Sequence, residues 1–478
     1  MKNFITVFLL LFSLSNYVTA QRILTLDDAL SIALSKSYAI KSAGYSLESS
    51  QKTLEALQRG LLSSVNLQFD LPNYSQTLSN QFNTQTGTEQ FYKLGYTTLE
   101  GRIFFNQPII FSNGTFSLIG SLWKRNQFTA QVEPIDYYSN LSLRLSQPLF
   151  TFNSQKASLT RAEINLEKSE RNYTKASKDI VYNVTSSFYR LFQAKKNAEI
   201  AEEKVKQSEV SYNTAMNKYK AGLIAEVEAM QLEVDLASSK NDLLSAQQNY
   251  NETKNDFKIL IGLGLDENID VSASLEYKPV DIDENTAVAL ALKNNTDLHN
   301  MDADIQLSDM NINEVDSKGN ISGLLSANFG VNKVDKNFEE IFHDFSEDRS
   351  VVFTLNVPVF DWGKNRREVE AAEAQYKQTT LSYENQKEVV KNNIIALVNK
   401  IKSAQARVEV LSKSVELAQK SYDITIKRFE AGTITSFDLS QMQLRLTDAK
   451  TSSLNALIDY KISLADLARR TFHDFEKD

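Results

Sequence analysis

Two segments of the chain, each longer than a hundred residues, contain a single glycine and no proline. Within residues 151–261 the only glycine is Gly222, and within residues 364–478 it is Gly432. Glycine and proline are the residues that most strongly interrupt helices. Each segment is therefore predicted to form one long helix up to its glycine and a second helix after it.

The long segments also have the periodicity of coiled coils. In the first, apolar or small residues follow a heptad rhythm through Leu159, Ala162, Leu166, Ser169, Tyr173, Ala176 and Ile180. A hydrophobic repeat of 3.5 residues winds helices around each other with a left-handed twist. A helix over residues 154–219 would be about 100 Å long at 1.5 Å per residue. We expect arms that reach across a distance, because no compact domain holds such an element.

The chain contains an internal duplication. Pro148 and Pro358, which each end a segment of alternating hydrophobicity, are separated by 210 residues, and so are Gly222 and Gly432. A looser match pairs residues 28–40 with residues 286–298, so the first copy carries 48 additional residues. Within them, residues 101–113 and 115–124 have the pattern of an additional hairpin whose place in the fold stays open. The predicted order is a signal peptide (1–20), a first repeat (21–261), a connector (262–282) and a second repeat (283–478). The first repeat would contain a helix, strands within about 65–147 and a helical hairpin over 154–260 with its tip at 222. The second would contain a helix, strands within about 321–357 and a helical hairpin over 365–470 with its tip at 432.

The first twenty residues have the pattern of a secretory signal peptide. Lys2 supplies a positive charge, residues 4–12 are apolar, and Val18-Thr19-Ala20 offers a cleavage site. The apolar run is shorter than the roughly 20 residues that a membrane-spanning helix needs. We therefore expect an exported protein whose mature chain begins near Gln21.

Four segments alternate between apolar and polar residues, which indicates strands with one apolar and one polar face. They are residues 65–71, 141–145, 321–331 and 351–357. A soluble sandwich would explain any one of them, but long alternating strands in an exported protein favour a lipid-facing barrel. Four strands per chain are too few to close a barrel, since such barrels begin at eight strands. Three chains would supply twelve.

The composition excludes several classes of function. The 52 basic and 60 acidic residues give a net charge of −8, which argues against a nucleic-acid partner. There is no cysteine, and there are only three histidines, so no disulfide, thiolate metal site or histidine-rich metal centre is expected. The sequence contains no phosphate-binding glycine loop and no nucleophile–base pattern. We predict a protein that is not an enzyme and needs no cofactor.

The duplicated order resembles the TolC family of outer-membrane efflux proteins. The resemblance rests on the strand-to-helix segments 146–150 (SQPLF) and 357–367 (VPVFDWGKNRR) and on the tips 219–223 (YKAGL) and 429–433 (FEAGT). It implies a mostly α-helical fold with a membrane β-barrel, in which a homotrimer forms a twelve-stranded barrel in the outer membrane and a helical tunnel of antiparallel coiled coils in the periplasm. It also implies a passive channel of a tripartite efflux or type I secretion system, with a periplasmic adaptor (membrane fusion) protein and an inner-membrane transporter as partners.

The resemblance also implies site residues. The hairpin tips would contact the adaptor through Ala221, Gly222, Leu223, Ala431, Gly432 and Thr433. The periplasmic entrance would be formed by Asp438 and Gln441 of the second copy and by Glu228 and Gln231 of the first. Asp438 stands where the family has an aspartate of the constriction, whereas Gln441 stands where the family has a second one.

Each of these sites has a simpler interpretation. The tips could be plain loops between antiparallel helices, and Asp438 could only stabilise the first turn of a helix, where acids are favoured by the macrodipole. For the whole chain, the alternative is a periplasmic or surface coiled-coil scaffold without a pore. The alternating strands distinguish the two hypotheses, because a scaffold needs no lipid-facing strands.

Overall fold

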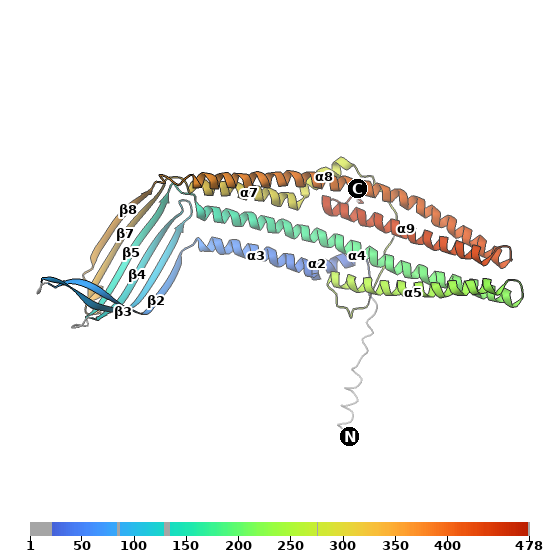
Figure 1. Cartoon of the computed structure of the whole chain (residues 1–478), viewed down its shortest axis with the longest axis horizontal. Coiled ribbons are helices and arrows are strands. Elements are labelled where there is room, and N and C mark those ends of the chain that lie inside the picture. The colour runs from blue at the N-terminus through green and yellow to red at the C-terminus, as the bar shows by residue number, and fades with distance from the viewer. Residues whose placement is uncertain (1–21, 84–86, 129–133, 275, 477–478) are drawn as a thin grey trace, which may run out of the picture. The chain divides into compact units, whose positions relative to one another are not determined.

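The computed structural model describes residues 22–83, 87–128, 134–274 and 276–476. The predicted signal peptide, residues 1–20, lies outside these ranges. The described part of the chain is mostly helical, with two long helix pairs and an antiparallel sheet (Figure 1). The elements are β1 (Arg22–Leu24), α2 (Leu26–Lys36), α3 (Tyr38–Gly60), β2 (Ser64–Asn83), β3 (Thr88–Ile109), β4 (Gly114–Phe128), β5 (Ile135–Leu149), α4 (Ser154–Lys220), α5 (Glu226–Ile261), β6 (Ile269–Val271), α6 (Glu284–Asn294), α7 (Thr296–Ser317), β7 (Ser322–Asp335), η1 (Glu340–Phe342), β8 (Ser346–Asn356), α8 (Lys364–Glu430) and α9 (Ser436–Thr471).

The chain divides into two compact units, and each contains parts of both predicted repeats. The first consists of Met1–Ser46, Glu170–His299 and Glu384–Asp478, and the second of Leu47–Ser169 and Asn300–Tyr383. The first holds α5, α9 and most of α4 and α8, and the second holds the sheet and the beginnings of α4 and α8.

The core of the first unit lies where the short parallel pair β1–β6 meets α2, α4 and α5. Phe188 of α4 and Phe257 of α5 are fully buried, with ring centroids 6.0 Å apart. Asp270 of β6 lies beside this core and accepts hydrogen bonds from Lys195 (2.8 Å) and from the Tyr250 hydroxyl (3.1 Å). Burial and the neighbouring Asp270 raise the pKa of Tyr250 to about 12. Burial acts to raise the pKa of Asp270, but the hydrogen bonds from Lys195 and from the Val271 amide outweigh it and lower that pKa.

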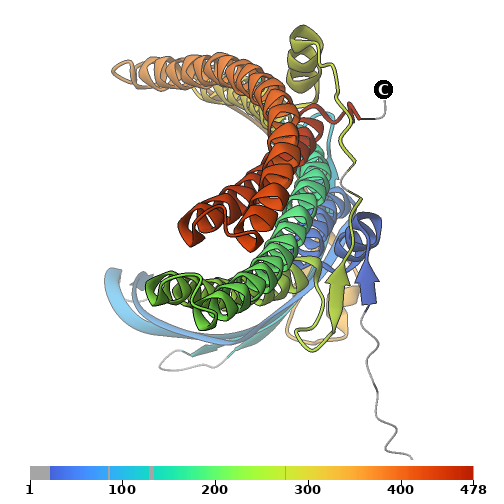
Figure 2. The same cartoon turned by 90° about the vertical axis from the view of Figure 1, so that its right-hand side faces the viewer.

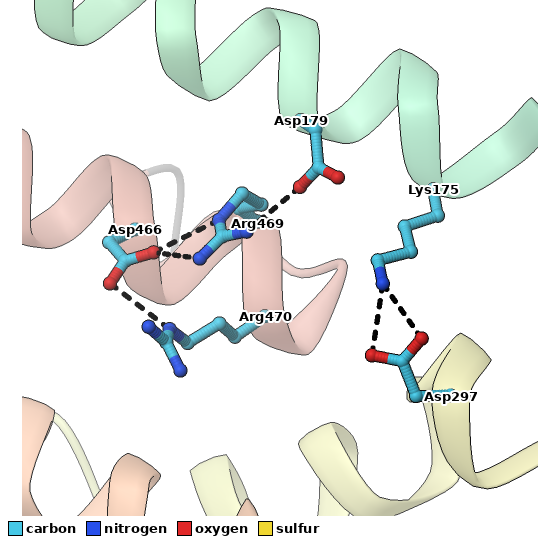
Figure 3. Close-up of polar contacts among 6 residues, drawn as sticks. All are labelled: Lys175, Asp179, Asp297, Asp466, Arg469 and Arg470. Atoms are coloured by element: carbon cyan, nitrogen blue, oxygen red, sulfur yellow. Dashed lines mark hydrogen bonds and ion pairs between the residues drawn. The ribbon is translucent and has the colours of Figure 1, made fainter. Parts of the chain in front are cut away.

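Ion pairs attach α9 and α7 to α4 in this unit (Figure 3). Arg469, near the end of α9, reaches Asp179 of α4 at 2.8 Å and Asp466 of its own helix at 2.7 Å. Lys175 of α4 contacts Asp297, in the first turn of α7, at 2.7 Å. The Arg469 and Asp179 side chains are 25% and 33% exposed, so their charges are less screened than those of Lys175 and Asp297, which are 38% and 50% exposed.

The second unit contains a single six-stranded sheet with the order β2-β3-β4-β5-β7-β8 (Figure 1). Every neighbouring pair is antiparallel. The four predicted alternating segments correspond to β2, β5, β7 and β8, and the sheet contains two further strands. The additional strands are β3 and β4, which include residues 101–109 and 115–124 of the predicted hairpin and are inserted between β2 and β5.

The junctions between strands and long helices differ in the two halves of the chain. Before α4, the Asn153 side chain accepts a hydrogen bond from the Lys156 amide at 2.9 Å. Before α8, the Asp361 carboxylate accepts from the Gly363 and Asn365 amides at 2.8 and 2.9 Å, and Gly363 has a φ of 74°. The difference lies at one matched position, where the second junction has Gly363 in the left-handed region that favours glycine and the first has Asn153 as a helix cap.

Candidate functional site

The first hairpin tip is a sharp reversal between α4 and α5. The Gly222 amide donates to the Tyr219 carbonyl and the Leu223 amide donates to the Lys218 carbonyl, both at 2.9 Å. This pair of bonds is a Schellman motif, which requires a left-handed residue at its centre. Gly222 supplies it with a φ of 73°. The predicted tip residues Ala221, Gly222 and Leu223 are all exposed.

The second tip has the same backbone design. The Gly432 amide donates to the Phe429 carbonyl, the Thr433 amide donates to the Arg428 carbonyl, and Gly432 has a φ of 74°. Ala431, Gly432 and Thr433 are exposed. The sequence signal at both tips was therefore the glycine that a Schellman motif needs.

Asp438 takes part in a capping box at the start of α9. Its carboxylate accepts from the Thr435 amide at 3.2 Å and from the Thr435 hydroxyl at 2.9 Å, while its own amide donates to that hydroxyl at 3.2 Å. The start of α5 has no such box, because its N-cap is Ala225. Asp438 is thus exposed and also stabilises its helix.

The other three predicted entrance residues lie near the same tips. Gln441 of α9 and Glu228 of α5 are half-buried, whereas Gln231 is exposed and donates to Asp235 of its own helix at 3.2 Å. Gln441 and Asp438 lie on α9, and Glu228 and Gln231 lie on α5.

The two tips pack against each other (Figure 2, green and red). Phe429 of α8 is buried in a cluster that also contains Leu232 of α5 and Leu439 of α9. Lys218 of α4 lies over the Phe429 ring, 4.6 Å from its centroid, and donates a hydrogen bond to the Phe429 carbonyl. The first hairpin is thereby fixed to the second at the end where both reverse.

A buried polar layer joins the hairpins farther from the tips. Gln443 of α9 is only 4% exposed and donates to the Lys204 carbonyl at 3.0 Å and to the Ser208 hydroxyl at 2.9 Å. Ser208 in turn contacts Ser239 of α5 at 3.0 Å. This layer was not predicted from the sequence. The sequence signal was the position of Gln443, which is four residues after Leu439 and three before Leu446. A coiled coil with this spacing is expected to have an apolar residue at that position.

The sheet forms a second candidate surface because its two faces differ in polarity. Residues opposite each other on neighbouring strands share a face. One row of opposite residues across all six strands is Val65, Phe105, Leu118, Leu143, Phe329 and Arg349. The adjacent row, on the other face, is Ser64, Asn106, Ser117, Arg144, Asn328 and Ser350.

The apolar face is exposed over much of the sheet. Leu67 and Leu141, on β2 and β5, are 64% and 52% exposed. A hollow of about 640 Å³ lies on this part of the sheet, and Phe342 and Phe345 help to line it. Large contiguous apolar surfaces that are exposed to solvent mark sites of interaction with another protein, a ligand or a membrane.

Exposed aromatic residues lie near both ends of the strands. At the helical end these are Phe111, Phe150, Phe360 and Trp362, all at least 73% exposed. At the opposite end Phe338 contacts Tyr137 and Phe342 edge to face, with ring centroids 5.6 and 5.5 Å apart. Membrane barrels carry aromatic residues at both lipid–water interfaces.

Among the described residues, none of the helices combines the length and the apolarity that crossing a membrane requires.

Comparisons with known proteins agree with this geometry. Residues 29–263 and 287–471 match the family described as outer membrane efflux protein. The chain is 22% identical to nodulation protein T of Rhizobium leguminosarum bv. trifolii over 68% of this chain and 70% of the relative.

Solved structures show the same fold. The outer membrane protein VceC of Vibrio cholerae is similar with a TM-score of 0.69 at 16% identity, over 94% of this chain and 96% of VceC. The CmeC outer membrane channel of Campylobacter jejuni is similar with a TM-score of 0.68 at 16% identity, over 95% of this chain and 88% of CmeC.

Proposed function

Because this chain belongs to the outer membrane efflux protein family, a family of bacterial outer-membrane channels and not of enzymes, we propose that three copies form one continuous duct. The sheet lies in the outer membrane, and the helical hairpins extend into the periplasm. The duct conducts passively, and its partners supply the energy.

The two-faced sheet is the observation that carries this proposal. Its exposed apolar face suits lipid and its polar face suits a water-filled lumen. In a coiled-coil scaffold dissolved in water, the exposed apolar face of this sheet would promote aggregation.

Exposed apolar stripes on the hairpins support association of several copies. On α5, Val227 and Val234 are 70% and 64% exposed, and the corresponding residues of α9 are Phe437 and Leu444 at 63% and 45%. A spacing of seven residues places each pair on one side of its helix. We propose that these stripes are covered where the hairpins of adjacent copies meet.

The exposed tips are the proposed contact with a periplasmic adaptor protein, which would connect the duct to an inner-membrane transporter. Leu223 is 72% exposed at the first tip. A rigid, exposed turn that carries an apolar side chain is a suitable anchor for a partner. The transporter would select the cargo, so both efflux of small molecules and secretion of proteins are compatible with this duct.

We further propose that Asp438 surrounds the entrance axis as a ring of three carboxylates, with Gln441 beside it and Glu228 and Gln231 on the neighbouring hairpin. Such a ring attracts cations.

Asp438→Asn keeps the oxygen that accepts from Thr435, so the helix cap is retained while the charge is removed. In single-channel recordings this variant should have a lower cation preference, whereas Asp448→Asn on the same helix should not. Unchanged selectivity would remove Asp438 from the entrance.

The duct itself is tested by extraction and electrophoresis. The full chain should fractionate with outer membranes, resist aqueous washing and change its mobility on heating in detergent, as folded barrels do. A protein removed by mild washing, with only helical circular dichroism, would contradict the proposal and favour the scaffold.

A further inference from the structure

The sheet carries an inference that rests on the proposed trimer. We propose that the wall of the duct in the membrane contains eighteen strands, six from each of three copies, in place of the twelve expected from the sequence. The hairpin β3–β4 is then a part of the wall and not an external loop.

The pairing of β3 and β4 supports their place in the wall. β3 pairs with β4 without interruption from Gly95–Phe128 to Ile109–Gly114, and β4 pairs with β5 from Thr115–Ser146 to Asn126–Ile135. These two strands continue both faces of the sheet, as Phe105 and Leu118 lie in the apolar row and Asn106 and Ser117 in the polar row.

The turn between β3 and β4 is also fixed to the start of the long helix α4. The Asn153 side chain donates to the Ile110 carbonyl at 2.7 Å, and the Gln147 side chain donates to the Ser112 carbonyl at 2.7 Å. Asn113, with a φ of 59°, accepts from the Gln155 amide at 3.2 Å. A hairpin outside the wall would lose these bonds, and their polar groups would be left to water or lipid.

The two edges of the sheet suit each other. The six strands alternate in direction, so β2 at one edge and β8 at the other run antiparallel. Every residue of β8 is exposed. Its Val351, Phe353 and Leu355 share the apolar face with Val65 and Leu67 of β2. We therefore expect β8 of one copy to pair with β2 of the next, which would leave no free edge after three copies.

The width of the helical part agrees with eighteen strands. Four helix segments of the second unit adjoin the sheet in sequence, from α3, α4, α7 and α8. Twelve helices about 9 Å apart, four from each copy, have a circumference of about 110 Å. Strands about 4.8 Å apart and tilted by about 40° give about 110 Å for eighteen strands but only about 75 Å for twelve. The larger wall continues the helical ring without narrowing.

Thiol cross-linking in the full chain can test the place of the hairpin, because the protein has no cysteine of its own. The paired substitutions Ser117→Cys and Arg144→Cys stand opposite each other on β4 and β5. Ser64→Cys and Arg144→Cys are separated by three strand spacings, about 14 Å, in the eighteen-strand wall, but lie on adjacent strands if β3–β4 is outside it. Arg144→Cys with Asn328→Cys, on β5 and β7, is the matched control that should link in either case.

The expected result, in heat-modifiable trimers treated with a short bifunctional thiol reagent, is linkage of the 117–144 and 144–328 pairs without linkage of the 64–144 pair. Mass spectrometry of the digested protein detects each link. Linkage of the 64–144 pair without the 117–144 pair would overturn the inference.

Electron microscopy of the protein in lipid nanodiscs provides a second measurement that needs no substitution. The wall at the level of the strands should be about 35 Å across between backbones, against about 24 Å for twelve strands. A trimer with the narrower wall would overturn only this inference. A monomer, or a protein that does not enter nanodiscs, would contradict the proposed function itself.

Discussion

At the scale of single residues, the two tips depend on glycine for a reason that the backbone angles make explicit. Gly222 and Gly432 have φ values of 73° and 74°, and a Cβ added to Gly222 would meet nothing within 4 Å. Any cost of a substitution there is therefore conformational and not a clash. The left-handed region costs an L-residue about 1–2 kcal/mol.

We expect Gly222→Ala to lower the free energy of unfolding by about 1 kcal/mol. Thermal unfolding in detergent, followed by circular dichroism, measures the loss. Gly60→Ala is the matched control, because Gly60 ends α3, also has open space around its Cβ position and shows no positive φ. Equal effects of the two variants would contradict the explanation.

Asp270 gives a prediction about pH. Its pKa is lowered in the folded chain, so its contribution to stability is present above the unfolded value near 3.8 and is lost as the pH falls through the folded value. At pH 7 the free energy of unfolding of Asp270→Asn should therefore be about 1–3 kcal/mol lower than that of the unmodified protein. The difference should shrink below about pH 4. Asp256→Asn, on an exposed part of α5, is the control and should leave the free energy of unfolding at pH 7 nearly unchanged.

At the scale of elements, the long helices follow directly from composition. With Gly222 as the only glycine in its segment, α4 runs unbroken from Ser154 to Lys220, and α8 runs in the same way from Lys364 to Glu430. The heptad rhythm could indicate that these helices pack in pairs, but not which polar groups would meet inside the pairs.

The polar layer at Gln443 should stabilise the association of the two hairpins. Gln443→Ala removes the amide that donates hydrogen bonds to the Lys204 carbonyl and the Ser208 hydroxyl. Both acceptors then lose this hydrogen bond inside the interface between the hairpins. We expect a loss of about 1–3 kcal/mol. Hydrogen exchange should become faster in α9 and in the facing part of α4.

The control for Gln443 is Gln231→Ala, because Gln231 is exposed and donates a hydrogen bond to Asp235 of its own helix at 3.2 Å. Its hydrogen exchange should stay close to that of the unmodified protein. If both variants behaved alike, the burial of Gln443 would not be what stabilises the hairpins.

At the scale of the whole molecule, the fold and the outer-membrane function could be predicted from the sequence, whereas the strand count could not. Alternation identifies strands such as residues 65–71, but it does not tell which strand lies beside which. In β3, Gly95 and Gly101 interrupt the alternation, and the hairpin pattern of residues 101–113 and 115–124 did not show that this hairpin lies between β2 and β5. Pairing is a long-range property and is decided by the whole sheet.

The site residues illustrate the same division. Gly222 and Gly432 were recognisable because a local turn needs them, and the capping role of Asp438 could be anticipated from its place in a first turn. Lys218 was not recognised, since its partners on α8 lie about two hundred residues away in sequence. Whether the tips bind an adaptor and whether Asp438 lines an entrance stay predictions, and both depend on how copies assemble.

The even number of strands per chain has a consequence for biogenesis. In the proposed duct the polypeptide enters the sheet from α3 and leaves it into α8 at the same end, so the links β2–β3, β4–β5 and β7–β8 would reach the far side of the bilayer. Among the described helices, only the three-residue η1 in the β7–β8 link would have to be carried through lipid during insertion. Lengthening one of these links with charged residues should slow insertion, whereas the same residues placed at the β3–β4 turn should not, because that turn never leaves the side on which the chain arrives.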